Sequence, residues 1–264
     1  MPALTVWRDE PADGPTNMAA DECLAAEADR RGTLLVRLYG WSPTTVSLGA
    51  FQRIDEACGV AGIRGVPLVR RPSGGGAIVH GSDLTYAAAV PKSHAWGASP
   101  QSLYDAFHGA MAEVLAGYGV AARPYRPPDE FAADAAAEPG FFCFDRRAAG
   151  DLVVDAPGPG GAADCKIMGS AQRRLAGVVL QHGSLLLWGN GDVTGAARHP
   201  GIAEAVPTAS LPDAEHLASI WLRRIADALG ATVDEQSASW ISGHAADVAS
   251  LANRFREDRW TGRR

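Results

Sequence analysis

The amino-acid sequence predicts an α+β fold, in which helices flank a mixed, largely antiparallel central sheet. Most of the expected strands follow one another in pairs without a helical crossover, a pattern that favours an α+β domain over a parallel doubly wound sheet. The chain has 264 residues, no internal repeat and no long linker. A chain of this length usually forms one domain or one domain with a small appendage, so we expect a single domain over residues 1–264.

The first half of the chain is expected to hold one helix and several short strands. Asn17 is a favoured N-cap residue and Gly32 is a typical helix stop, so we expect a helix over residues 17–31. Short β-branched or apolar runs that are bounded by turn residues predict the strands. These strands are expected over residues 34–39, 45–48, 66–69, 77–79 and 84–90.

The second half begins with the clearest helix, over residues 101–118, where apolar residues recur at helical spacing. Residues 126–140 contain several prolines, and we expect a loop or a short helix there. The remaining expected elements are strands over residues 152–155, 166–172 and 177–188, a Gly/Pro-rich loop over 156–163, and helices over 212–229 and 241–256.

Composition and charge exclude several classes of protein. A hydrophobic fraction of 47% and a charged fraction of 20% are those of a globular protein and not of a disordered one. The net charge of −6 argues against a general nucleic-acid binder. The chain has no apolar run of about 18 residues, and its first residues lack the pattern of a signal peptide. We therefore expect a cytoplasmic protein without a nucleic-acid or membrane partner.

The first segment that can carry chemistry is a glycine-rich loop after a strand. Gly74, Gly75 and Gly76 let the backbone approach a ligand closely and direct N–H groups at it. Arg70 and Arg71 precede them, and we expect both at the mouth of the loop, where they would attract an anionic or carbonyl-bearing ligand. A glycine-rich hairpin without a ligand is an equal alternative. The segment is neither a P-loop nor a Rossmann fingerprint.

The second segment starts at Lys166, which precedes a run of small residues on an expected strand. An ammonium group that points into a cleft stabilises an oxyanion or a phosphate, although most lysines are solvated surface groups. His80 and His182 lie on or beside apolar strands. A histidine in such a position is more often a satisfied core residue than a catalytic base.

The cysteines offer a nucleophile rather than a metal site. Four cysteines are unevenly spaced without a C-x-x-C pair, so we expect neither a disulfide framework nor a metal site. Cys143 precedes Arg146 and Arg147, and positive charge lowers the pKa of a thiol, which favours a nucleophile. The alternative is that Cys143 is a small buried hydrophobic residue without a chemical role. Cys165 is the rival candidate. Neighbouring strand residues point to opposite faces, so a Lys166 that points into the cleft turns Cys165 away and favours Cys143.

Five stretches follow one another along the chain: Asn17–Glu22, Leu38–Pro43 with Ser47–Gln52, Val69–Ala77 with His80, Lys166–Gln172, and Leu180–Ser184. Together and in this order, they resemble the biotin/lipoate protein ligase and octanoyltransferase family. The resemblance implies a mixed sheet flanked by helices, with an acyl tunnel between the glycine loop and the lysine strand. It also implies a single catalytic domain, with a core at about residues 17–190 and a helical C-terminal extension at about 200–264.

The same resemblance implies the residues of a site. Cys143 and Lys166 are expected to be catalytic. The residues expected to bind substrate are Arg70, Arg71, Ser73, Gly74, Gly75, Gly76, Ala77, His80, Gly169, Ser170, Ala171 and His182.

Within the family, the chain resembles most the branch of cysteine-dependent octanoyltransferases. Cys143-Phe144-Asp145 is similar to the cysteine segment of that branch, and Asp83–Tyr86 to its strand after the glycine loop. The resemblance implies transfer of an octanoyl or lipoyl group from acyl carrier protein to a lysine of a lipoyl or glycine-cleavage carrier domain. The group would pass through a thioester on Cys143, and no cofactor would be needed.

The alternative within the family is an ATP-dependent lipoate-protein ligase, which acts through lipoyl-AMP with ATP and Mg²⁺ and needs no cysteine. Gly76 stands where the transferase branch often has arginine, and Gly150-Asp151-Leu152 partly resembles a ligase motif. A third class, a binding module without catalysis, is disfavoured by the presence of both Cys143 and Lys166. The length of the acyl group and the identity of the carrier stay open at this point.

Overall fold

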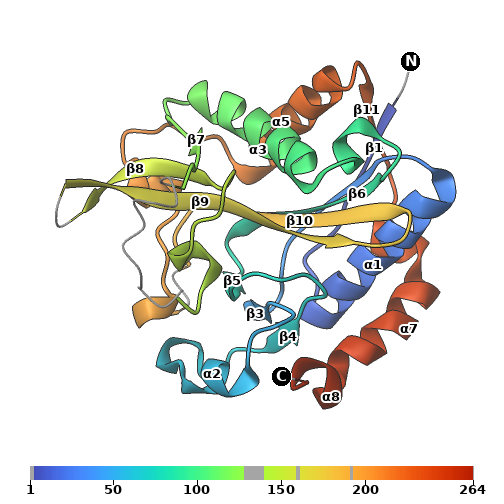
Figure 1. Ribbon diagram of the computed structural model, residues 1–264, viewed down its shortest axis with the longest axis horizontal. Coiled ribbons are helices and arrows are strands. Elements are labelled where there is room, and N and C mark those ends of the chain that lie inside the picture. The colour runs from blue at the N-terminus through green and yellow to red at the C-terminus, as the bar shows by residue number, and fades with distance from the viewer. Residues whose placement is uncertain (1–2, 128–139, 159–160, 191–192, 264) are drawn as a thin grey trace.

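The computed structural model describes residues 3–127, 140–158, 161–190 and 193–263 (Figure 1). Within these residues, one sheet has eight strands in the order β11-β1-β2-β6-β10-β9-β8-β7, and a small sheet has the order β4-β3-β5. The strands of the large sheet are β1 (Ala3–Arg8), β2 (Leu35–Tyr39), β6 (Asp83–Pro91), β7 (Arg123–Pro124), β8 (Leu152–Gly158), β9 (Gly161–Arg174), β10 (Val178–Leu186) and β11 (Thr232–Glu235). Those of the small sheet are β3 (Thr45–Leu48), β4 (Leu68–Arg70) and β5 (Ile78–His80).

The pairing confirms the predicted mixed, largely antiparallel sheet. From β2 through β6, β10, β9 and β8 to β7, each strand runs antiparallel to its neighbour. β1 is parallel to both β2 and β11. The sequence analysis predicted neither β1 nor β11. β11 is short and mostly exposed, so it carries little of the apolar pattern that marks a strand.

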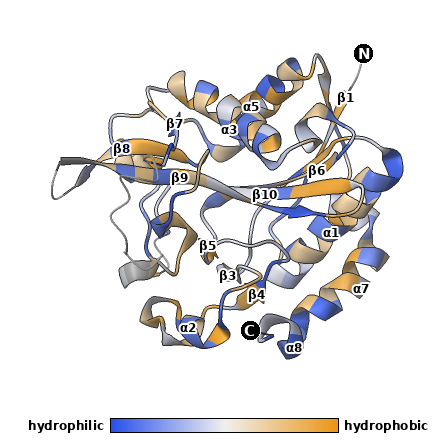
Figure 2. Cartoon of the chain, in the orientation of Figure 1, coloured by the Kyte–Doolittle hydropathy of each residue, from blue (hydrophilic) through white to orange (hydrophobic). Residues whose placement is uncertain are grey.

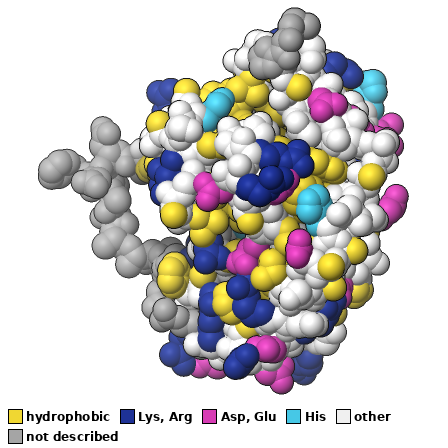
Figure 3. Space-filling model, turned by 90° about the vertical axis from the view of Figure 1, so that its right-hand side faces the viewer, with side chains coloured by type: hydrophobic (Ala, Val, Ile, Leu, Met, Phe, Trp, Pro, Cys, Tyr) yellow, Lys and Arg dark blue, Asp and Glu magenta, His cyan; other side chains and the backbone are white. Residues whose placement is uncertain are grey.

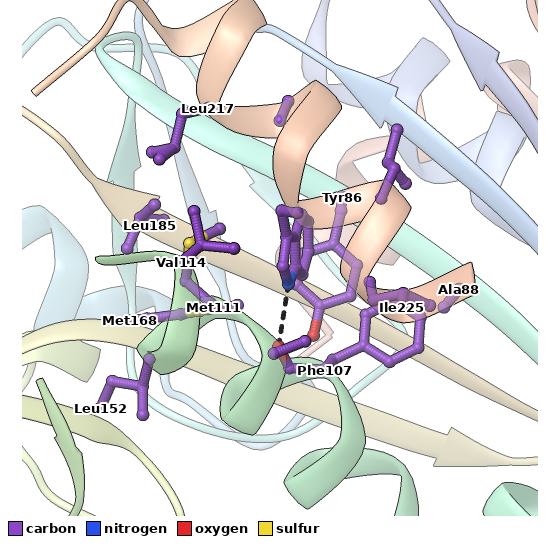
Figure 4. Packing of buried hydrophobic residues seen from close by; sticks show 14 of the residues in the cluster. Tyr86, Ala88, Phe107, Met111, Val114, Leu152, Met168, Leu185, Leu217 and Ile225 are labelled. Atoms are coloured by element: carbon purple, nitrogen blue, oxygen red, sulfur yellow. Dashed lines mark hydrogen bonds between the residues drawn. The ribbon is translucent and has the colours of Figure 1, made fainter. Parts of the chain in front are cut away.

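Helices cover both faces of the large sheet (Figures 1 and 2). α3 (Pro100–Ala116) and α5 (Ala214–Ala228) cover one face, and α1 (Gly14–Arg31) and α7 (Ala245–Arg256) cover the other. Successive residues of β6 therefore enter different cores: Tyr86 packs with α3 and α5, whereas Ala87 packs with α1. Phe107 stacks on Tyr86 with ring centres 5.2 Å apart in the first of these cores (Figure 4). The remaining helices are α2 (Ile54–Gly59), α4 (Ile202–Ala205), α6 (Trp240–Gly243) and α8 (Asp258–Thr261), with 3₁₀ turns η1 (Ala61–Ile63), η2 (Ala95–Gly97), η3 (Cys143–Asp145) and η4 (Gly195–Ala197).

The first helix begins one turn earlier than predicted. Asp13 and not Asn17 is the N-cap, because its carboxylate accepts the backbone N–H of Thr16 at 2.8 Å. A proline in the first turn also fits the start of a helix. Asn17 lies inside the helix and donates to the carbonyl oxygens of Ala12 and Gly40. The predicted end is confirmed, since Gly32 has a φ of 65°.

Two elements of the second half differ from their predictions, and most of a third lies outside the described residues. The prediction of a Gly/Pro-rich loop over residues 156–163 is wrong, because β8 and β9 stay paired up to Gly158 and Gly161. The helix expected over 241–256 is divided between α6 and α7. Most of the loop expected over 126–140, residues 128–139, lies outside the described residues.

The C-terminal helices pack on the N-terminal half. The indole of Trp260 in α8 donates to the carbonyl oxygen of Arg70 at 2.9 Å, and Arg70 donates to the carbonyl oxygen of Thr261 at 2.8 Å. Glu22 of α1 binds both Arg254 of α7 and Arg173 of β9. Acidic and basic side chains are intermingled on the face of the molecule shown in Figure 3. In the described part of the chain, none of the helices has the length and apolar character needed to span a bilayer.

Candidate active site

A register shift between β8 and β9 arranges the side chains around Lys166. Val153 pairs with Lys166 but Leu152 pairs with Met168, so β9 holds one extra residue at this point. The shift places Lys166 over Gly169, where a Cβ atom would lie 2.4 Å from Lys166 Cε. Cys165 packs instead against the core beneath α3 and α5. The structure therefore confirms that Cys165 and Lys166 point to opposite faces.

The ammonium group of Lys166 is buried and lies against two partners. Nζ is 2.7 Å from Asp151 Oδ2, 3.3 Å from Cys143 Sγ and 3.2 Å from the Cys143 carbonyl oxygen. Burial by itself lowers the pKa of Lys166, but the negative charges of Cys143 and Asp151 outweigh it, and the pKa is raised above its ordinary value. Lys166 is therefore a buried positive charge in direct contact with the sulfur of Cys143.

Asp151 is a site residue that the sequence analysis did not select. It is fully buried and accepts hydrogen bonds from the Tyr104 hydroxyl at 2.7 Å and from the backbone N–H of Ala148 at 2.8 Å. These donors hold the carboxylate that compensates the charge of Lys166. The partial resemblance of Gly150-Asp151-Leu152 to a ligase motif was a signal that could have identified Asp151.

The glycine loop positions Cys143 through the backbone. The N–H of Cys143 donates to the carbonyl oxygen of Ala77 at 2.7 Å, and the N–H of Ala77 donates to that of Phe141 at 3.0 Å. A Cβ atom at Gly76 would lie 2.7 Å from the Cys143 nitrogen. The backbone before and at Cys143 thus occupies the space that a side chain at position 76 would need.

Cys143 borders a first, narrow pocket, here called the acyl pocket, which has a cavity volume of about 40 Å³. The acyl pocket lies on the face of the sheet that α1 covers and follows one row of paired residues across four strands. Because neighbouring strands lie roughly 4.8 Å apart, the row is roughly 14 Å long. The row consists of Gly169 of β9, Ser184 of β10, Thr85 of β6 and Tyr39 of β2. Other residues around it are Met18, Trp41, Ser47, Arg71, Gly75, Ile78, His80, Cys143, Ser170, Ala171, His182 and Gly183.

Cys143 also borders a second, wider pocket, here called the arginine pocket, with a cavity volume of about 470 Å³. Gly75, Cys143 and Ser170 line both pockets, so the sulfur lies where they meet. The other residues of the arginine pocket are Gly76, Tyr104, Gly140, Asp145, Arg146, Arg147, Ala148, Asp151 and Lys166.

His80 lies in the wall of the acyl pocket with both ring nitrogens engaged. Nδ1 is 2.7 Å from Asp83 Oδ2, and Nε2 is 2.8 Å from Ser47 Oγ. The ring stacks on Trp41 with centres 3.9 Å apart. Burial raises the pKa of Asp83, but His80 and hydrogen bonds from Ser184 and Gly81 bring it down to about 2.

His182 has a similar arrangement, with Nδ1 3.2 Å from Asp21 Oδ2 and Nε2 hydrogen-bonded to Ser73. Both histidines are therefore satisfied wall residues, and neither has a free ring nitrogen in the described structure for proton transfer. Ser73 does not line the acyl pocket itself and is linked to it by its hydrogen bond to His182.

Arg70 and Arg71 do not lie at the mouth of the loop, as the sequence analysis expected. Arg71 is buried and donates to the carbonyl oxygens of Ser47, Gly74 and Gly76, so it shapes the loop from inside. Burial lowers its pKa to about 10. Arg70 is fully buried, donates to carbonyl oxygens of Gly49 and Gln52, and lines neither pocket.

Ser170 links the site to a buried chain of polar groups that sequence reasoning missed. Gln181 donates to the Tyr86 hydroxyl at 2.6 Å, which lies 2.8 Å from Ser170 Oγ. Ser170 Oγ is 2.7 Å from His108 Nε2, and His108 Nδ1 is 2.8 Å from the carbonyl oxygen of Gly150. Burial lowers the pKa of His108 to about 4, so its neutral ring is part of the folded structure.

Burial raises the pKa of Cys23 to about 11 and also raises that of Cys165. Among the described residues, no three His, Cys, Asp or Glu side chains are grouped so as to hold a metal ion.

Comparison with known sequences links the chain to one family. A family model described as the lipoyl protein ligase A/B catalytic domain matches residues 13–212. The octanoyltransferase LipM of Geobacillus kaustophilus (strain HTA426) is 36% identical over 178 residues, which cover 65% of this chain and 60% of that protein. The chain thus spans about 60% of the length of this curated relative.

Solved structures share the fold. A lipoate-protein ligase A bound with ATP has a TM-score of 0.70 at 18% identity, over 99% of both chains. A bipartite lipoate protein ligase from Thermoplasma acidophilum, described with its E2 lipoyl domain, has a TM-score of 0.67 at 17% identity, over 99% of this chain and 96% of that one. At these identities the likeness concerns the fold alone.

The buried His108 predicts how stability depends on pH. Its pKa is about 4 in the folded protein and about 6.5 when unfolded. The unfolded chain therefore takes up the proton first, and stability is lost as the pH falls from about 6.5 to about 4, by roughly 3 kcal/mol. Asp83 acts in a lower window, because its pKa falls from 3.8 to about 2 on folding.

Urea unfolding of the wild type and of His108→Gln between pH 7 and pH 4 measures this contribution. We expect the free energy of unfolding of the variant to vary less steeply with pH in this range. Parallel curves for the two proteins would contradict a neutral buried His108.

Proposed function

The chain belongs to the lipoyl protein ligase A/B catalytic-domain family, and we propose that it is an acyltransferase that uses Cys143 as its nucleophile. It transfers an octanoyl or lipoyl group from acyl carrier protein to a lysine of a lipoyl or glycine-cleavage carrier domain. One observation carries this proposal: Cys143 Sγ lies 3.3 Å from the buried Lys166 ammonium, at the junction of the two pockets. The relative named octanoyltransferase supports it.

In the first half-reaction the thiolate of Cys143 attacks the carbonyl carbon of the donor thioester. A new S–C bond forms, the bond to the carrier sulfur breaks, and the carrier thiolate leaves and takes up a proton. Lys166 lies beside the attacking sulfur and donates to the oxyanion that develops on the carbonyl. The acyl chain lies in the acyl pocket, over Gly169 and Ser184.

In the second half-reaction the neutral amine of the acceptor lysine attacks the thioester on Cys143. An amide bond forms, the S–C bond breaks, and the amine proton passes to the departing Cys143 sulfur. Lys166 remains the charged group that contacts this sulfur, while His80 and His182 have both ring nitrogens engaged. Conversion of a thioester to an amide is downhill, so this route consumes no ATP.

The ligase alternative is favoured by the Gly150-Asp151-Leu152 motif and by the three glycines of the loop. Under it, Lys166 and the glycine loop would hold an acyl-adenylate, with Mg²⁺ balancing its charge. Cys143 would then have no chemical part. The two reactions therefore differ in the donor that they need and in their dependence on Cys143.

Mass spectrometry with octanoyl-acyl carrier protein alone tests Cys143. We expect one octanoyl group on the protein, labile to hydroxylamine as thioesters are, and its passage to a lipoyl domain that is added afterwards. Cys143→Ala should lose both the adduct and the transfer, because no other sulfur touches Lys166 among the described residues. Cys165→Ala is the matched control and should keep both. Full activity of Cys143→Ala with ATP and free octanoate would replace this proposal by the ligase.

The close contact of the Lys166 side chain with Gly169 provides a test of Lys166 that keeps the lysine in the sequence. A methyl group at residue 169 would overlap Lys166 Cε, so Gly169→Ala should move the ammonium from the sulfur. We expect the rate of Cys143 acylation to fall by roughly 10- to 100-fold, the usual effect of misplacing a catalytic group.

Gly109→Ala is the control for this variant, because no atom lies within 4 Å of a Cβ atom at residue 109. Single-turnover acylation and thermal unfolding of both variants give the comparison. An acylation rate of Gly169→Ala equal to that of the wild type would remove Lys166 from the chemistry.

A further inference from the structure

The glycine loop depends on neighbouring segments for its conformation. Its three consecutive glycines have no side chains with which to pack, and glycine backbone is intrinsically free. The loop follows β4, which is three residues long and is the edge strand of the small sheet. One side of β4 therefore has no strand partner among the described residues, and the backbone groups on that side need other partners.

The C-terminal helix α8 supplies those partners at Arg70, the last residue of β4. The indole N–H of Trp260 donates to the carbonyl oxygen of Arg70 at 2.9 Å, and Arg70 Nε donates in return to the carbonyl oxygen of Thr261 at 2.8 Å. Trp260 is itself held in place. Its ring packs on Phe255 with ring centres 5.2 Å apart and lies 4.7 Å from the guanidinium carbon of Arg254.

Close backbone packing carries this contact from Arg70 to the nucleophile. Arg70 Nη1 donates to the carbonyl oxygen of Gly49 at 2.8 Å. A Cβ atom at Gly49 would lie 2.0 Å from the carbonyl oxygen of Gly75, and one at Gly76 would lie 2.7 Å from the nitrogen of Cys143. A shift of Arg70 is therefore passed through the loop to Cys143, because there is no space between these segments to absorb it.

Gln52 provides a second connection between the same two points. Its carbonyl oxygen accepts a hydrogen bond from Arg70 Nη1 at 2.7 Å, and its side-chain Nε2 donates to the carbonyl oxygen of Phe141 at 2.8 Å. Phe141 lies two residues before Cys143. Gln52 Oε1 also accepts the N–H of Gly49 at 2.9 Å, so the two connections are joined.

We propose that α8 is a positioning element of the active site, in which Trp260 holds Arg70 and the glycine loop so that Cys143 stays in contact with Lys166. The proposal rests on the acyltransferase function proposed above and specifies how its nucleophile is aligned. Trp260 lies outside both pockets, so it acts through Arg70 and does not touch the substrate. The family model ends at residue 212, so α8 adds this support from outside the matched residues.

Trp260→Phe tests the proposal, because it keeps an aromatic ring and removes only the N–H that binds Arg70. Acylation of Cys143 by the octanoyl thioester of pantetheine is followed by single-turnover mass spectrometry over a range of donor concentrations. We expect the limiting rate to fall by roughly 2- to 10-fold, the effect of about one hydrogen bond. Trp260→Ala should lower it by roughly 10- to 100-fold, the effect of misplacing a catalytic group. The half-saturating donor concentration should stay near that of the wild type, because neither variant alters a pocket wall.

Trp240→Phe is the matched control. The Trp240 indole in α6 also donates to a backbone carbonyl oxygen, that of Ala20 at 3.1 Å, and it lies outside both pockets. This variant loses the same kind of hydrogen bond and should keep the wild-type acylation rate. Thermal unfolding shows that each variant is folded, and the two phenylalanine variants decide the test if Trp260→Ala is not.

Three results would overturn the positioning role while leaving the cysteine mechanism in place. They are a wild-type limiting rate in Trp260→Phe, equal losses of rate in Trp260→Phe and Trp240→Phe, and a raised half-saturating concentration with an unchanged limiting rate. Absence of any acylation of Cys143 in the wild type would instead overturn the proposed function, and this inference with it.

Discussion

Lys166 carries a buried ammonium group, and burying such a charge is costly unless negative charge and hydrogen-bond acceptors lie beside it. Here Asp151, the sulfur of Cys143 and the carbonyl oxygen of Cys143 surround Nζ. Each of these groups is held in turn, Asp151 by Tyr104 and Ala148, and Cys143 by Ala77. The requirement to compensate one charge therefore brings together α3, β8, β9, η3 and the glycine loop.

The walls of the acyl pocket are stabilised by polar groups that bind one another. His80 joins Asp83 to Ser47, and His182 joins Asp21 to Ser73. Asp21 also accepts from Arg37, which is buried between α1 and β2. Because these groups satisfy one another, the wall holds its shape around the pocket.

Much of the fold was predictable from periodicity, since the long helices and the central strands carry regular apolar patterns. The pairing of Lys166 with Cys143 followed from alternation along a strand together with a family resemblance. The extra residue near Met168 was not predictable, because a register shift depends on the partner strand β8 and leaves no local pattern. Regular alternation along β9 would place Lys166 and Met168 on the same face. The register shift separates them, so that Met168 enters the core while Lys166 faces the site. Arg70 and Arg71 looked like ligand-binding residues, yet burial turns both toward carbonyl oxygens of the loops around them.

A crystal structure of the protein after reaction with an octanoyl thioester tests the central claim most directly, because it locates the acyl group relative to Lys166. We predict continuous density from Cys143 Sγ into the acyl pocket, with the chain over Gly169 and Ser184 and its end toward Tyr39. The thioester carbonyl oxygen should lie within hydrogen-bond distance of Lys166 Nζ. An unmodified Cys143, or an acyl chain attached there but lying outside the acyl pocket, would contradict the account.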